Sequence, residues 1–222
     1  MKKILVFFIG IWAFSCAPSR FVEPLEKGQH AVALDLGGPL IEFGGLIIPT
    51  PMSSISYGYG LDSTKTLYGG LHTTSLLFGN LHLDAGATFK LLNQTGIQPN
   101  LSVSPAITFI SRPGADATNF WPRLDVNAYW NYGKRNNYFY AGATNWFEPQ
   151  ANRAHGEATL KRFLFNPQIG HTAKFGTWQL QTELKFLAPG EDNSFVFVPY
   201  RSVFGNNGAT GLYINLIKTF GK

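Results

Sequence analysis

Two histidines and an aspartate, His72, His82 and Asp84, are the residues whose types and spacing best suit chemistry. If two neighbouring strands meet at the turn 78–80, His72 and Asp84 become diagonal neighbours on one polar face. A histidine oriented by a carboxylate can act as a general base for a hydroxyl such as that of Thr74. The sequence supplies no recognisable oxyanion hole, so we interpret these residues as a hydrogen-bond network and expect no catalytic residue.

The same three side chains have donor types that suit zinc. His82 lies beside the expected turn, however, and the three donors need not converge on one point. We therefore predict neither a metal site nor a cofactor.

The elements that position these residues are strands, because apolar and polar residues alternate along most of the chain. In residues 81–91 every odd position is apolar, while the even positions include His82, Asp84 and Lys90. The pattern predicts an all-β fold of about ten antiparallel strands, near 29–37, 53–61, 66–76, 81–91, 101–110, 122–132, 138–147, 162–175, 178–187 and 209–220. Each of these strands reaches the roughly 9–11 residues that cross a bilayer when tilted. Eight strands remain an alternative, because Pro105, Pro122 and Pro167 fall inside predicted strands, where proline is expected only at an edge, a strand start or a bulge.

Two hairpins test this interpretation. Gly176 at the first position of a two-residue turn predicts that Phe175 faces Trp178. In the hairpin formed by the predicted strands 122–132 and 138–147, pairing Tyr132 with Tyr138 would place aromatic residues at both ends of the strands. Two aromatic girdles at the membrane interfaces would have the same distribution.

The composition excludes several classes of protein. Only 14% of the 222 residues are charged, against about 25% in an average globular chain, while 45% are apolar and 15% aromatic. Apolar content of this size excludes disorder, and a single cysteine excludes a disulfide scaffold. Lysine and arginine are scattered rather than gathered in a stripe, so no nucleic-acid partner is expected.

The N-terminus has the form of a targeting segment, with Lys2 and Lys3 before the uncharged apolar run 4–14. The residues Ala13-Phe14-Ser15-Cys16 then resemble the lipobox of bacterial lipoprotein signal peptides, although Ala13 and Phe14 depart from its usual residues. The resemblance implies a signal peptide at 1–15 and a lipid, such as a palmitate-containing anchor, on Cys16. We expect a lipid-anchored segment at 16–28 and a β-barrel domain at 29–222.

Over residues 29–220 the chain resembles the broad class of small bacterial outer-membrane β-barrels, which are antiparallel, up-and-down and transmembrane. A lipid on Cys16 at the periplasmic leaflet would place both ends of the barrel chain on the periplasmic side. The outward connections would then be 38–52, 77–80, 111–121, 148–161 and 188–208, most of them long, as this class shows. The resemblance implies the outer membrane of a Gram-negative bacterium and contact with outer-membrane lipid.

The polar faces would line the barrel lumen as a mixed-charge network. Its expected members are His72, His82, Asp84, Lys90, Arg123, Asp125, Lys174, Glu183 and Lys185. Three functions follow as hypotheses. The first is a non-catalytic barrel with a structural, adhesive or narrow small-solute passage role, with a solute or partner protein at the loop 188–208. The second is a soluble periplasm-facing lipocalin-like lipoprotein, whose apolar face would hold an apolar ligand. The third is an outer-membrane lipid hydrolase built on His72 and Asp84.

Overall fold

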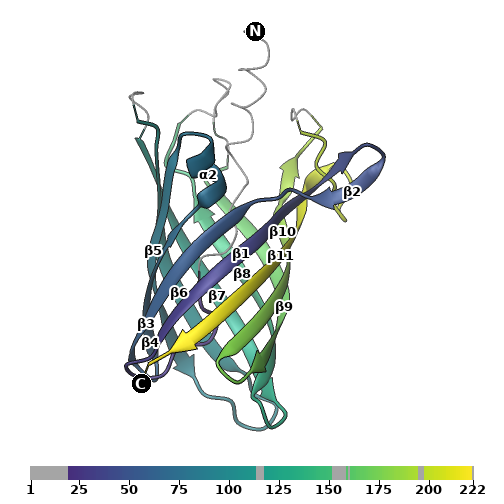
Figure 1. Ribbon diagram of the computed structural model, residues 1–222. Helices are drawn as coiled ribbons and strands as arrows, with labels where there is room; N and C mark the ends of the chain where they lie inside the picture. The colour runs from purple at the N-terminus through teal and green to yellow at the C-terminus, as the bar shows by residue number, and fades with distance from the viewer. Residues whose placement is uncertain (1–19, 114–117, 152–158, 160, 195–197, 222) are drawn as a thin grey trace.

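Ten strands close into an antiparallel barrel in the part of the chain that the computed structural model describes, residues 20–113, 118–151, 159, 161–194 and 198–221 (Figure 1). They are β1 (His30–Phe43), β3 (Ser53–Asp62), β4 (Lys65–Leu71), β5 (Leu81–Leu92), β6 (Asn100–Ser111), β7 (Thr118–Tyr132), β8 (Asn137–Phe147), β9 (Phe163–Phe175), β10 (Trp178–Asp192) and β11 (Asn207–Phe220). Each strand pairs with the next, and β11 pairs with β1 from His30↔Phe220 to Pro39↔Gly211. Closure removes the sheet edges, so the backbone groups of the ladder find partners within the barrel.

The ten-strand prediction is confirmed and the eight-strand alternative is wrong. Pro105, Pro122 and Pro167 lie inside continuous strands, where they pair with Leu124, Ile107 and Ala143. Each proline pairs on one side of its strand only. The β5–β6 ladder has no pair at Pro105, and the β7–β8 and β9–β10 ladders end at Arg123 and Gln168, one residue from Pro122 and Pro167. A missing backbone donor is tolerated at such positions.

Two further elements lie at one end of the barrel (Figure 1). β2 (Leu46–Pro49) pairs with the last residues of β1 to form a projecting hairpin, where a loop was predicted. α2 (Thr73–Leu77) replaces the predicted end of the strand 66–76, which stops at Leu71. The hydroxyls of Thr73 and Thr74 hold this helical turn against Ser53, and Gly79, with φ of 78°, ends it. Among the described residues, no helix is long and apolar enough to cross a membrane.

The two ends of the barrel differ in their connections. Residues 63–64, 93–99, 133–136 and 176–177 connect strands at the end where the C-terminus lies, which we call the short-turn end (Figure 1). The opposite end, which we call the long-loop end, carries α2, the β1–β2 hairpin and the connections 112–117, 148–162 and 193–206.

Apolar side chains face outward and polar ones inward. Leu34, Leu216 and Leu180 are paired neighbours on three strands and are 51%, 39% and 40% exposed. The adjacent paired row, Asp35, Asn215 and Gln181, is buried in the lumen. A soluble ligand-binding barrel requires the reverse arrangement, so the outward apolar face does not favour the lipocalin-like alternative. This is the arrangement of a transmembrane barrel.

Exterior aromatic side chains gather near both ends of the barrel. Exposed examples are Tyr132, Phe175, Trp178 and Phe220 at the short-turn end and Phe120, Phe147 and Phe163 at the long-loop end. Two such girdles around an aliphatic band match the two interfaces of a bilayer.

The two hairpins used as tests had different outcomes. Phe175 pairs with Trp178 across Gly176, whose φ is 64°, as expected. Tyr132 pairs with Asn137 instead of Tyr138, because the loop is one residue shorter and Asn136 adopts a positive φ of 52°. A slip of one residue exchanges the two faces of a strand. Tyr138 and Tyr140 are therefore buried in the lumen rather than placed in a girdle.

The outward face yields a first prediction. Leu216→Arg places a charge in the aliphatic band and is expected to lower the free energy of unfolding in lipid vesicles by about 2–4 kcal/mol. The same change at Leu46, in the hairpin beyond the barrel wall, is the control and is expected to cost about 1 kcal/mol or less. Denaturant titration of both variants measures the difference, and equal losses would contradict a membrane-facing wall.

Candidate functional site: the filled lumen

The chain before β1 runs inside the barrel. Arg20, Phe21, Val22 and Leu25 are all at least 95% buried, although they precede the first strand. The Thr88 hydroxyl donates to the Phe21 carbonyl at 2.9 Å.

Further hydrogen bonds continue down this segment. The Ser102 hydroxyl donates to the carbonyl of Val22 at 2.7 Å, and the Leu25 amide donates to Thr66 Oγ1 at 2.7 Å. Three inward-facing strand residues, Thr88 of β5, Ser102 of β6 and Thr66 of β4, thus satisfy the backbone of the segment. The lumen is built to hold this piece of chain.

Two glycines of β3 make the room for it. A Cβ on Gly58 would overlap the ring of Phe21, and one on Gly60 would overlap the carbonyl of Glu26. Both glycines face the lumen, so their missing side chains allow the segment to approach the barrel wall. The repeated glycine at inward positions of one strand is the signal in the sequence that could have indicated this segment.

Arg20 is the charged centre of the lumen. Its Nε lies 3.0 Å from Asp125 Oδ1 of β7, and its guanidinium also donates to Glu183 of β10. The three side chains are about 1% exposed. Unpaired carboxylates at this depth would be costly, so Arg20 ties the segment to two separate strands.

The ion pairs continue on both sides of Arg20. Lys185 Nζ lies 3.4 Å from Glu183 Oε1 and donates to Thr144 Oγ1 at 3.0 Å. Arg123 Nε lies 3.5 Å from Asp125 Oδ2. The cations Arg20, Arg123 and Lys185 thus alternate with the carboxylates Asp84, Asp125 and Glu183.

The histidine cluster forms the end of this network beneath α2. His72 Nε2 lies 2.9 Å from Asp84 Oδ2, although the diagonal strand pairing expected for them is wrong, since His72 follows the end of β4. The His72 and His82 rings stack with centroids 3.6 Å apart. The Thr108 hydroxyl donates to Asp84 Oδ1 at 2.6 Å, and Arg123 lies 3.6 Å from Asp84 Oδ2.

One ligand atom from each of His72, His82 and Asp84 lies within 4.8 Å of the others, so the three do converge. Both Asp84 oxygens are already engaged, and one of them faces the cationic Arg123. The imidazole planes are within 18° of parallel, so lone pairs in those planes do not point at a shared centre. The geometry describes a hydrogen-bond network better than a metal centre.

Thr74 and Ser75 of α2 carry hydroxyl groups next to this cluster. Thr74 Oγ1 accepts from the Ser53 amide at 2.8 Å. Ser75 Oγ lies 3.2 Å from His82 Nδ1, because α2 turns it toward the cluster. Asp84 lies against Nε2 of His72 and Ser75 against Nδ1 of His82, and the two imidazole rings stack on each other.

The remaining expected lumen residues lie toward the short-turn end. Lys174 pairs with Glu23 of the N-terminal segment, and Glu23 Oε1 also accepts from Asn131 at 3.3 Å. Lys90 is half-buried near the end of β5, outside the alternating chain of ion pairs. Cys16 lies outside the described residues.

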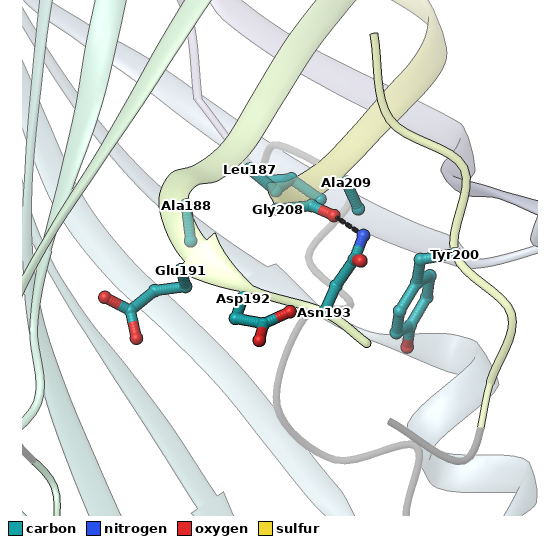
Figure 2. A pocket seen from close by; sticks show the side chains of 8 residues that line it. All are labelled: Leu187, Ala188, Glu191, Asp192, Asn193, Tyr200, Gly208 and Ala209. Carbon is teal, nitrogen blue, oxygen red and sulfur yellow. Dashed lines mark hydrogen bonds between the residues drawn. The ribbon is translucent and has the colours of Figure 1, made fainter. Parts of the chain in front are cut away.

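The long-loop end holds a small cavity between the end of β10 and the start of β11 (Figure 2). Its volume is about 20 Å³, enough for about one water molecule. Asn193 donates to the Gly208 carbonyl, and burial raises the pKa of the lining residue Tyr200. The cavity is too small for a solute, and the apolar residues Phe195–Phe197 of this loop lie outside the described residues.

No protein-family model and no curated protein matches the sequence. Among solved structures, the chain is similar to the translocator domain of the autotransporter NalP from Neisseria meningitidis, with 10% identity over 90% of this chain and 91% of that one, and a TM-score of 0.48. It is also similar to the outer membrane protein OprG from Pseudomonas aeruginosa, with 8% identity over 91% of this chain and 100% of that one, and a TM-score of 0.33.

The lumen geometry predicts that Arg20→Met is strongly destabilising. The change leaves Asp125 and Glu183 without their shared cation, which is expected to cost about 3–5 kcal/mol in the free energy of unfolding. Lys65→Met is the matched control, because it breaks an exposed pair with Asp62 and should cost about 1 kcal/mol or less. Adding Glu183→Gln to Arg20→Met should restore part of the loss, and no restoration would contradict the electrostatic explanation.

Proposed function

We propose that this chain is a lipid-anchored outer-membrane β-barrel that does not conduct or catalyse, and that has a structural or adhesive role at its long-loop end. The observation that carries this proposal is a transmembrane-type barrel whose lumen is filled by its own N-terminal segment. The outward aliphatic band and its two aromatic girdles support membrane insertion. The lipobox-like sequence before Cys16 supports the lipid anchor.

The filled lumen argues against small-solute passage. Side chains just fill the interior of an eight-stranded barrel, and ten strands enclose little more space. Here Phe21, Val22 and Leu25 add buried apolar bulk, and Arg20 joins two non-adjacent strands of the wall through Asp125 of β7 and Glu183 of β10. Passage would require residues 20–28 to leave the lumen.

A lipid-hydrolase function is also less well supported. The serine and the carboxylate contact different histidines, as described above. The cations and carboxylates of the lumen are engaged with one another, which suits a rigid interior.

Conductance tests the filled lumen. The wild-type protein in planar bilayers is expected to show no steady conductance. Arg20→Glu should open a channel, because the new carboxylate repels Asp125 and Glu183 and drives the segment out. Lys65→Glu, at an exposed turn, is the charge-matched control and should remain closed. Steady conductance of the wild type, as large as that of Arg20→Glu, would support passage instead.

Membrane extraction tests the anchor and the barrel separately. Cys16→Ser should abolish incorporation of labelled palmitate, because it removes the proposed acylated thiol. The unlipidated protein should nevertheless resist carbonate washing and change its gel migration on heating, as a spanning barrel does. Release of this variant into the wash would contradict membrane insertion, while retained palmitate labelling would contradict the anchor alone.

A further inference from the structure

Asp35 of β1 is the lumen carboxylate for which the described part of the chain supplies no ion pair. The residue is 1% exposed, and its Oδ2 accepts from the hydroxyls of Ser54 and Ser56 at 3.1 Å each. Its Oδ1 is also buried and accepts no hydrogen bond from the described residues. Two neutral hydroxyls do not balance a buried negative charge, so this carboxylate requires a further positive group.

The cationic side chains of the lumen are committed elsewhere. The charge of Arg20 attracts Asp35, but its guanidinium pairs with Asp125 and Glu183. The second of these carboxylates repels Asp35 and is also the partner of Lys185. Side chains of the described lumen therefore leave the charge of Asp35 uncompensated.

Asn215 of β11 lies beside Asp35 with both of its amide atoms unused. The two residues are directly paired in the β1–β11 ladder and both are buried in the lumen, which places their Cβ atoms about 4.5–5.5 Å apart. Asn215 is 2% exposed, yet neither its Oδ1 nor its Nδ2 has a hydrogen-bond partner among the described residues. Gln181, its neighbour on the other side, donates to Tyr140 instead. Buried polar atoms left in this way mark the place of a bound water or ion.

Apolar side chains close this place toward the short-turn end. Ala33 and Ile217, the next inward residues of the two strands, are paired with each other and pack with Phe21. Groups of this kind cannot solvate a carboxylate. The charge of Asp35 must therefore be met between Asp35 and Asn215.

We propose that Asp35 and Asn215 hold a monovalent metal cation such as Na⁺ between their Oδ1 atoms. Hard cations take oxygen ligands, and carboxylate and side-chain amide oxygens are both among them. A single positive charge balances the single carboxylate, whereas a water molecule would satisfy the polar atoms and leave the charge. The ion would brace β1 against β11, the pair of strands that closes the barrel. This structural site goes beyond the proposed function and does not depend on the role of the long-loop end.

Sodium dependence of unfolding tests the site. The full-length protein in lipid vesicles is unfolded with urea at about pH 8, in NaCl or in choline chloride of equal ionic strength. Above half-saturation of the site, each tenfold rise in Na⁺ should lower the unfolding equilibrium constant of the wild type about tenfold. Asp35→Asn should remove this response, because the charge is lost while the shape is kept. Asp62→Asn, at an exposed ion pair, is the control and should respond like the wild type.

Two other results would overturn the proposal. If Asp35 holds a proton instead, Na⁺ has no effect, and the wild type loses stability relative to Asp35→Asn between about pH 6 and pH 9, as the proton leaves. If a water molecule alone fills the place, neither Na⁺ nor pH separates the wild type from Asp35→Asn.

A second variant tests the position of Asn215. Asn215→Asp adds a carboxylate beside Asp35, so the pair should now favour a divalent cation. Added Ca²⁺ should lower the unfolding equilibrium constant of this variant by about tenfold more than that of the wild type. Asp35→Asn in the same chain should cancel the gain. A response to Ca²⁺ no larger than that of the wild type would place Asn215 away from the ion and contradict the site.

Discussion

Arg20 carries a positive charge into the middle of the lumen, and the arrangement of the interior depends on it. Asp125 and Glu183 belong to strands that do not pair with each other, and both are buried against the same guanidinium. Without that cation the two carboxylates would face each other in a confined space, a state that costs far more than a surface ion pair contributes. The N-terminal segment is therefore part of the folded barrel rather than a tether, and the barrel wall and its contents stabilise each other.

The low charge content of the chain follows from the same constraint. A wall that faces lipid excludes charges outside, so the buried charges must lie in the lumen and find partners there. Arg20, Arg123 and Lys185 pair with Asp84, Asp125 and Glu183, and Thr108 and Thr144 donate to further oxygens of Asp84 and Asp125. A fourth lumen carboxylate, Asp35, accepts from the Ser54 and Ser56 hydroxyls. Each additional lumen charge would need a new partner. Neutral Ser, Thr, Asn and Gln therefore fill much of the inner face.

The sequence predicted the parts of the fold that local pattern controls. Alternation placed the strands and their faces, and Gly176 specified the hairpin register of Phe175 and Trp178. The register of Tyr132 was wrong because a turn of four residues and one of five are equally compatible with that sequence, and only the positive φ of Asn136 distinguishes them. The N-terminal segment was missed because it lacks periodicity. Its position is set by tertiary contacts. In the sequence these contacts are indicated only by the inward-facing Gly58 and Gly60, whose missing side chains make room for the segment.

A lumen that is filled by the N-terminal segment and linked across strands by buried ion pairs makes the barrel a rigid support for the long-loop end. There the last residues of β1 pair with β2 on one side and with residues 199–201 on the other. On the second side, the Glu42 amide donates to the Pro199 carbonyl and the Arg201 amide donates to the Leu40 carbonyl. The resulting small sheet continues the barrel wall beyond its rim and exposes Phe43 and Leu46 at the hairpin tip. Binding surfaces on a fixed scaffold lose less conformational entropy when they meet a partner. The rigid, filled lumen therefore supports the proposed structural or adhesive role at the long-loop end more than it supports solute passage.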